Sequence, residues 1–296
     1  MPNDFKILNQ KIGLGESVQL KMDIARLNTR SKIDVPIIVS RGLKEGPCLL
    51  LIGGIHGDET NGVEIVRQIV ASGLNKPEKG TVICIPLLNV FGFLSLTREF
   101  PDGRDLNRMF PGSNTGSLAS RFAFHLMNKV IPKVDYCIDY HTGGAQRFNY
   151  SQVRISGNDE ESLKLAKIFG SPYIVFSKSK EKTFRKSMVD LGKKVLLFEG
   201  GKSLNLDKVV TKSGIQGAIN IMHHLGMRDF SSKITKTNPE NPPIIIKSSK
   251  WIRAKHSGMY RSYISVGQKV EKGVKLGSIS DPFGEFESSF KNPQEG

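Results

Sequence analysis

The stretch LLLIGGIHGDETNG, residues 49–62, passes from an apolar run directly into glycines and a group of ionisable side chains. The run LLLI has the composition of a strand that is buried on both faces, as strands of parallel sheets are. His56, Asp58 and Glu59 then follow within four positions. A solvated turn would account for the two carboxylates, but not for a histidine set among glycines. The stretch therefore indicates a buried strand that ends at a functional site.

Strand-like and helix-like segments alternate from about residue 47 to residue 226. The alternation predicts an α/β fold with a mixed, mostly parallel sheet that is flanked by helices. The first 46 residues instead favour antiparallel strands at a sheet edge. The clearest segments are the strand-like GTVICIPLLNV (80–90), VDYCIDYH (134–141) and KKVLLFEGG (193–201), and the helix-like GVEIVRQIVASGL (62–74) and LDKVVTKSGIQGAINIMHHLGM (206–227).

A change of composition near residue 240 predicts two domains. The segment SKITKTNPENPPI (232–244) is polar and rich in proline, as linkers are. The residues after it are β-like, with glycines at turn spacing. We therefore expect a catalytic domain over residues 1–240 and a small all-β domain over residues 241–296.

The charge and composition argue against several classes of protein. A net charge of +15 raises nucleic acid as a partner, but the lysines are scattered and lack interleaved aromatic residues, so a solvated surface is favoured. The apolar runs are shorter than the roughly 20 residues of a membrane span. The first ten residues lack the apolar core of a signal peptide. The three cysteines are an odd number, which does not suggest a framework of disulfide bonds. We expect a cytoplasmic protein with no membrane or nucleic-acid partner.

Ionisable residues bounded by glycine follow several of the predicted strands. In open α/β sheets, reactive groups gather at the carboxyl ends of strands. His56 and Glu59 have an H-x-x-E spacing on a tight loop, and His141 ends another strand in DYHTGG. Two histidines and one glutamate, with water as the fourth ligand, are a known catalytic arrangement for Zn²⁺. The pattern predicts one zinc ion per chain.

Two further strand ends carry candidates for catalysis and substrate binding. Glu199, in LFEGG, is placed to take a proton from an attacking water and to pass it to a leaving amine. The segment TREFPDGRDLNRMFPG (97–112) holds Arg98, Arg104 and Arg108 together with Asn107. A guanidinium suits a substrate carboxylate or the developing charge of an oxyanion.

The sequences GGIHGDETNG, RDLNRMFPG, DYHTGG and LFEGG, in this order, resemble the succinylglutamate desuccinylase/aspartoacylase family. Its members are zinc-dependent amidohydrolases related to the metallocarboxypeptidases. The resemblance spans roughly residues 10 to 290, and the ordered set is specific where each motif alone is not. It implies a zinc carboxypeptidase-like fold with His56, Glu59 and His141 as zinc ligands and Glu199 as general base and acid.

The resemblance also implies roles for the residues of the arginine-rich segment. Asn107 and Arg108 match the pair that holds the substrate carboxylate, and Arg98 matches the arginine that polarises the scissile carbonyl. Arg104 is nearer to DLNR and competes with Arg98 for that role. Asp139 is two positions before His141, so both would point to one face of a strand. It is a candidate to support a ligand histidine, with a buried salt bridge as the alternative.

The tail from Trp251 to Gly284 resembles the small β domain of the same family, which is like a biotinyl/lipoyl-type barrel. It has no lysine between two methionines, so an attached cofactor is not implied. Because the sequence ends at FESSFKNPQEG without a second strand-turn repeat, we expect the barrel to be incomplete, or to be finished by another element or subunit. The oligomeric state stays open, and a homo-oligomer is compatible with it.

These observations together predict a zinc-dependent hydrolase that cleaves the amide bond of an N-acyl amino acid or a similar small, carboxylate-bearing amide. Its partner would be a small anionic substrate. The alternative with the same metal chemistry is a metallocarboxypeptidase that acts on peptide C-termini. An alternative of another class is a basic nucleic-acid-binding module, suggested by the net charge alone.

Overall fold

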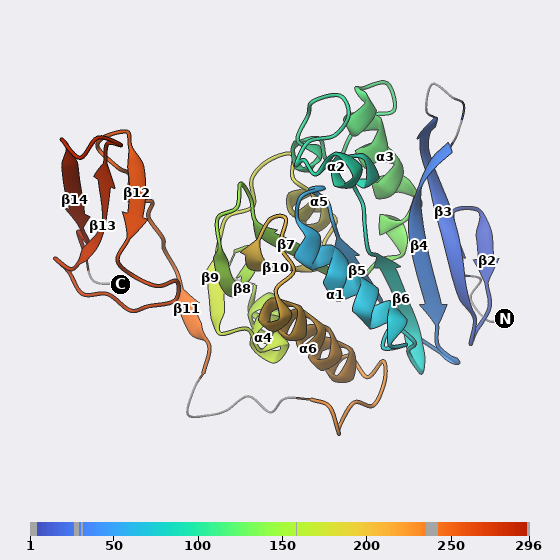
Figure 1. The fold of residues 1–296 in the computed structure, drawn as a ribbon. Helices are drawn as coiled ribbons and strands as arrows, with labels where there is room; N and C mark the ends of the chain where they lie inside the picture. Colours follow the sequence, from blue (N-terminus) through green and yellow to red (C-terminus); the bar gives the residue numbers. More distant parts are fainter. Residues whose placement is uncertain (1–4, 27–29, 31, 158, 235–241, 295–296) are drawn as a thin grey trace. The chain divides into compact units, whose positions relative to one another are not determined.

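A nine-stranded mixed sheet crosses the larger part of the protein (Figure 1). The computed structural model describes residues 5–26, 30, 32–157, 159–234 and 242–294. In hydrogen-bonding order the strands are β11 (Ile244–Ile246), β9 (Tyr173–Phe176), β8 (Asn149–Ile155), β10 (Lys194–Lys202), β7 (Tyr136–Gly143), β5 (Lys44–Gly53), β6 (Lys79–Ile85), β4 (Lys32–Arg41) and β3 (Ser17–Arg26).

The pairing of these strands is mostly parallel. The parallel pairs are β11–β9, β9–β8, β10–β7, β7–β5 and β5–β6, whereas β8–β10, β6–β4 and β4–β3 are antiparallel. The predicted mixed, mostly parallel sheet is therefore confirmed. The N-terminal strands β3 and β4 lie at one edge, next to a short hairpin of β1 (Phe5–Ile7) and β2 (Gln10–Ile12).

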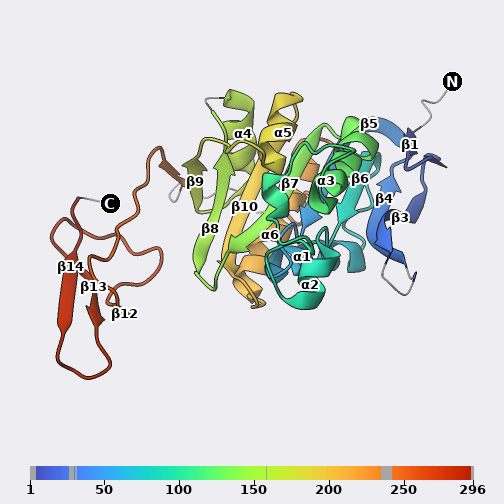
Figure 2. The same cartoon turned by 90° about the horizontal axis from the view of Figure 1, so that it is seen from above.

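Helices cover both faces of the sheet, as Figure 1 and Figure 2 show from two directions. One apolar cluster joins the sheet to α1 (Thr60–Ala71), α4 (Glu160–Phe169) and α6 (Lys208–His224). The other joins the opposite face to α2 (Val90–Ser95), α3 (Leu118–Lys129) and α5 (Phe184–Asp190), with the short helices η1 (Leu106–Arg108) and η2 (Ile131–Lys133).

Strand β5, which contains the apolar run LLLI, is buried on both of its faces. Leu50 and Ile52 of β5 belong to one apolar cluster, and Leu49 and Leu51 belong to the other. All four side chains are fully buried. A strand covered on both faces has no solvated side, so its sequence does not alternate between polar and apolar residues.

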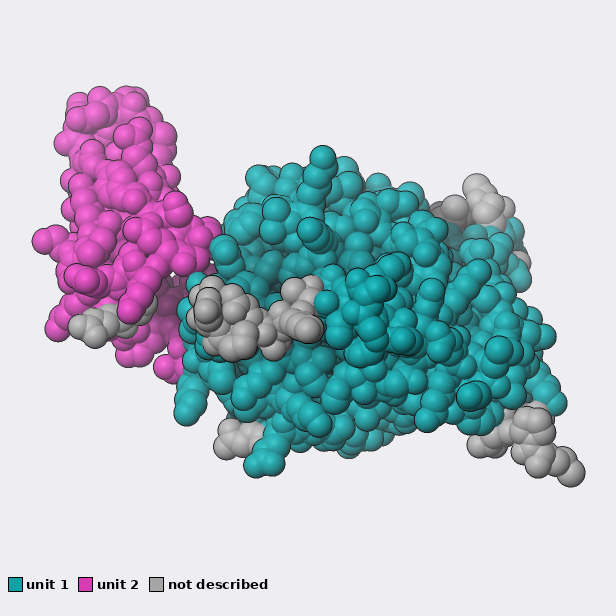
Figure 3. All heavy atoms as spheres, turned by 90° about the horizontal axis from the view of Figure 1, so that it is seen from below, with its two compact units in different colours: residues 1–247 teal, residues 248–296 magenta. Residues whose placement is uncertain are grey.

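A second, smaller unit follows the sheet. The chain divides into Met1–Lys247 and Ser248–Gly296, coloured separately in Figure 3. The smaller unit holds an antiparallel sheet of β12 (Met259–Ser262), β13 (Lys275–Ser280) and β14 (Glu287–Lys291). Its closure into a barrel stays a prediction. The boundary predicted near residue 240 lies outside the described residues, and β11 follows it within the larger unit.

Within the part of the chain that the structure describes, no helix combines the length and the apolar composition that a bilayer-spanning segment needs.

Candidate active site and metal centre

The candidate site lies where β5, β7 and β10 end. These strands are neighbours in the sheet and run in parallel, so their carboxyl ends meet at one edge. His141 of β7 and Glu199 of β10 are direct partners in the ladder. The loop after β5 carries His56 and Glu59 to the same place. Residues far apart in the sequence are thereby brought to one site.

Glycines allow the loop after β5 to pass close to other backbone. Gly54 has a left-handed φ of +62°, a conformation that side chains disfavour. A Cβ atom on Gly57 would lie 1.9 Å from the carbonyl carbon of Gly92, in α2. Only a residue without a side chain fits at that crossing. The glycines around His56 therefore set the path of the loop.

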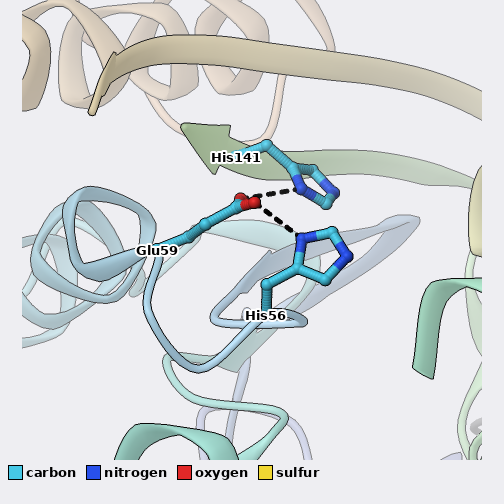
Figure 4. A group of neighbouring side chains, drawn as sticks. All are labelled: His56, Glu59 and His141. Atoms are coloured by element: carbon cyan, nitrogen blue, oxygen red, sulfur yellow. Dashed lines mark hydrogen bonds and ion pairs between the residues drawn. The ribbon is translucent and has the colours of Figure 1, made fainter. Parts of the chain in front are cut away.

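His56, Glu59 and His141 form a buried group with converging ligand atoms (Figure 4). The Glu59 carboxylate lies between the two imidazole rings. His56 Nδ1 is 2.7 Å from Glu59 Oε1, and His141 Nδ1 is 2.9 Å from Glu59 Oε2. One ligand atom from each residue lies within 4.8 Å of the others. This is the group predicted as zinc ligands, and the structure brings all three together.

A carboxylate contacts the Nε2 atom of each imidazole ring, on the side away from Glu59. His56 Nε2 lies 3.2 Å from Asp105 Oδ1, and His141 Nε2 lies 3.0 Å from Asp139 Oδ2. Histidines that ligate metals commonly donate their other N–H to a carboxylate, which fixes the ring and its tautomer. Both Nδ1 atoms are thus turned toward the centre. Of the two alternatives for Asp139, the structure shows the contact with the histidine.

The charges of the group oppose the effect of burial. Burial lowers the pKa of His141, but Asp139 and Glu59 outweigh it, and the pKa lies well above its usual value. Burial raises the pKa of Glu59, but His56 and His141 outweigh it and hold the pKa far below its usual range. The site therefore favours positive charge between these side chains. A divalent cation would satisfy the same preference.

Asp105 was not among the candidates from the sequence, yet it connects several of them. Arg98 donates from Nη2 and Nε to Asp105 Oδ2, at 2.9 and 3.2 Å. Arg98 Nη1 also reaches Glu59 Oε1 at 3.3 Å. Asp105 Oδ1 accepts the backbone N–H of Asn107 at 2.8 Å, besides its contact with His56. The only sign of this role in the sequence was that Asp105 is the first residue of the DLNR motif.

The two arginines that compete for the carbonyl occupy different positions. Arg98 faces Glu59 and Asp105, as described above. Arg104 instead points to Asp102, with its Nη1 at 3.3 Å from the backbone carbonyl and 3.7 Å from Oδ2, and its side chain is 51% exposed. The structure brings Arg98 to the candidate site and does not bring Arg104 there.

Asn107 and Arg108 differ in how much of their side chains is available. Asn107 is buried, and its Oδ1 accepts the N–H of Phe184 at the start of α5, at 2.9 Å. The Arg108 side chain is 41% exposed. Its Nη1 donates to the carbonyl of Asn107 at 2.6 Å and lies 3.9 Å from Asp105 Oδ2. Asn107 thus places the segment, and Arg108 keeps a partly exposed guanidinium.

Glu199 lies beside His141 in the sheet, and residues of β8 hold its carboxylate. Its Oε2 accepts from Asn149 Nδ2 at 2.6 Å, and its Oε1 lies 3.5 Å from Arg154 Nη1. The side chain is 13% exposed. Burial raises the pKa of Glu199, against the opposing effects of Arg154, His141 and Asn149. Asn149 and Arg154 were not predicted as site residues, because the sequence of a strand does not show which strand it will pair with.

Comparison with known proteins identifies the family of this chain. Residues 45–225 match the model of the succinylglutamate desuccinylase/aspartoacylase catalytic domain. The chain is 29% identical over 262 residues to an N-alpha-acetyl-L-2,4-diaminobutyric acid deacetylase from Halomonas elongata, which covers 83% of this chain and 74% of that protein. The protein belongs to the succinylglutamate desuccinylase/aspartoacylase family.

Solved structures share the fold. A succinylglutamate desuccinylase/aspartoacylase from Rhodobacter sphaeroides superposes with a TM-score of 0.81 at 24% identity, over 95% of this chain and 88% of that one. The product-bound ectoine utilization protein EutE (DoeB) from Ruegeria pomeroyi superposes with a TM-score of 0.84 at 20% identity, over 96% and 90%.

Proposed function

We propose that the protein is a zinc-dependent hydrolase that cleaves the amide bond of an N-acyl amino acid or a similar small, carboxylate-bearing amide. The observation that carries the proposal is the buried group of His56, Glu59 and His141, with Arg98 and Glu199 at the same edge of the sheet. Family membership supports it, as does the similarity to a deacetylase of an N-acetylated amino acid. Action on a small anionic substrate in the cytoplasm is part of the proposal.

The donor set fits a zinc ion. Two imidazole nitrogens and a carboxylate suit Zn²⁺, and the carboxylates behind both rings are typical of a zinc site. His56 and His141 would bind through Nδ1 and Glu59 through its carboxylate. When bound, zinc lowers the pKa of a water molecule to about 7 and polarises a carbonyl oxygen.

Residues of this chain would supply the remaining steps. Glu199 takes the proton of the attacking water and returns it to the leaving amine, a task that suits a carboxylate whose pKa burial has raised. Arg98, fixed by Asp105, donates to the carbonyl oxygen as negative charge develops there. Arg108 binds the carboxylate of the substrate through its exposed guanidinium.

A substrate panel with removal and return of the metal tests the proposal. N-acetyl, N-succinyl and N-formyl amino acids are assayed with the purified protein, after chelation, and after zinc is restored. We expect chelation to abolish hydrolysis, zinc to restore it, and Glu199→Ala to stay inactive with its zinc bound. Hydrolysis that survives both chelation and Glu199→Ala would refute the mechanism. Preference for peptides with free C-termini over the whole panel would favour the metallocarboxypeptidase alternative.

A further inference from the structure

Strand β8 contacts both oxygens of the Glu199 carboxylate. Asn149 donates its side-chain amide to Oε2 at 2.6 Å, and the guanidinium of Arg154 pairs with Oε1 at 3.5 Å. The two contacts come from opposite ends of the strand, because Asn149 begins β8 and Arg154 lies near its end. A carboxylate held at both oxygens has lost its freedom to rotate about its terminal bond.

The antiparallel pairing of β8 with β10 explains how both residues reach the same side chain. Arg154 stands opposite Leu197, two residues before Glu199, and so shares its face of the sheet. Up to Glu199, the register would place Tyr150 opposite Gly201. The register shifts after Glu199, so Asn149, and not Tyr150, lies opposite Gly201. The irregularity thus brings an amide side chain to the carboxylate.

On the β10 side, a glycine with a left-handed φ stands at this irregularity. Gly201 has a left-handed φ of +74°, and a Cβ atom there would lie 2.7 Å from Asn61 Nδ2. Between the flanking pairs β8 has two residues and β10 has one, so β8 carries the bulge, and bulges beside active sites commonly re-aim a side chain. The LFEGG segment therefore supplies the carboxylate, and the bulge in β8 brings its amide partner to it.

The contact of Arg154 with Glu199 differs from that of Asn149 because it brings a positive charge to the carboxylate. Glu199 is largely buried, and burial of a carboxylate favours its protonated form. Nothing in the transfer of a proton requires Asn149 or Arg154 to touch the substrate. Their contacts instead fix where the Glu199 oxygens lie and keep a positive charge beside them.

We infer that Asn149 and Arg154 are positioning residues for the reaction: from β8 they hold the two oxygens of Glu199 in the orientation in which this carboxylate accepts and returns the proton. The inference rests on the proposed role of Glu199. It assigns a function to β8, the strand that lies between β10 and the β9–β11 edge of the sheet.

Steady-state kinetics of zinc-loaded variants test the inference. We expect kcat to fall by about 10- to 100-fold in Asn149→Ala and in Arg154→Met, the size of effect that a misplaced catalytic group produces. KM, zinc content and melting temperature should stay at the parent values, because the inference has both residues act through Glu199 alone. Arg154→Lys should recover part of kcat, since it restores the charge. Ser151→Ala, on the same strand, is the matched control and should behave like the parent.

Comparison with the single variant Glu199→Gln separates this inference from the proposed function. If Glu199→Gln is fully active, the proposed function fails. If Glu199→Gln is impaired but Asn149→Ala and Arg154→Met turn over like the parent, only the inference fails. It fails equally if their loss of kcat comes with loss of zinc or a lowered melting temperature. In the Glu199→Gln background, adding Asn149→Ala should cause little further loss, because residues that act through one group are not additive.

Discussion

Replacing Asp105 by asparagine should separate the two roles that its carboxylate combines. Oδ1 accepts from His56 and from the backbone N–H of Asn107, while Oδ2 accepts two hydrogen bonds from Arg98. Asparagine has one side-chain oxygen. If that oxygen keeps the two contacts of Oδ1, the amide nitrogen faces the Arg98 guanidinium, and two donors oppose each other. Arg98 is then released while the histidine keeps its acceptor.

The magnitude follows from which contacts are lost. At saturating zinc, kcat/KM should fall about 100-fold, the cost of removing one well-placed donor to a developing oxyanion. His56 keeps a neutral acceptor in place of a charged one. Loss of such outer support lowers metal affinity about 10- to 100-fold, and we expect the low end, equivalent to about 1.4 kcal/mol.

Two measurements check Asp105→Asn independently. Competition with a chelator of known affinity reports zinc binding, and kinetics at saturating zinc report the effect of Arg98. Asp102→Asn makes the same chemical change in the same loop. The Asp102 carboxylate pairs with Arg104 and accepts the backbone N–H of Ala119. It should leave both quantities close to the parent. Parent-like kcat/KM for Asp105→Asn at saturating zinc would refute the argument that this carboxylate places Arg98.

The arginines and the loop glycine give further predictions. Arg98→Lys should lower kcat by at least about tenfold while Arg104→Lys leaves it unchanged, and the reverse order in steady-state kinetics would exchange their roles. Arg108→Ala should raise KM for substrates with a free carboxylate but not for their carboxamide analogues, and an equal effect on both would contradict carboxylate binding. Gly57→Ala should lower the free energy of unfolding by about 3 kcal/mol, because its Cβ meets the backbone of α2. Gly103→Ala, with open space around it but a φ of +74°, should cost about 1 kcal/mol in the same denaturant titration, and equal costs would refute the steric account.

The main features of the fold were predictable because their signals are local. Continuous apolar runs such as that of β5 mark strands covered on both faces, and each was followed by a helical segment or by a glycine-bounded group. The rule that parallel strands end at one edge then placed His56, Glu59 and His141 together. The structure brings these three side chains to one site.

The residues that support the site were harder to predict, because their roles depend on pairing between distant segments. Asn149 reaches Glu199 only through the irregular register of β8 and β10. Asp105 lies in a segment with several charged residues, and its sequence does not show that it faces His56 and Arg98. Spacing alone left Arg98 and Arg104 in competition. The path of the loop, which turns Arg104 toward Asp102, separates them.

Strand β11 has a practical consequence for cutting the chain into separate pieces. It pairs with β9 from Ile244 to Ile246, after the helices of the larger unit are complete. Without it, the backbone of β9 would become the open border of the sheet, and an unprotected border recruits strands from other molecules. A fragment made to contain only the catalytic part should therefore extend through Lys247. A shorter fragment should self-associate even if His56, Glu59 and His141 are intact.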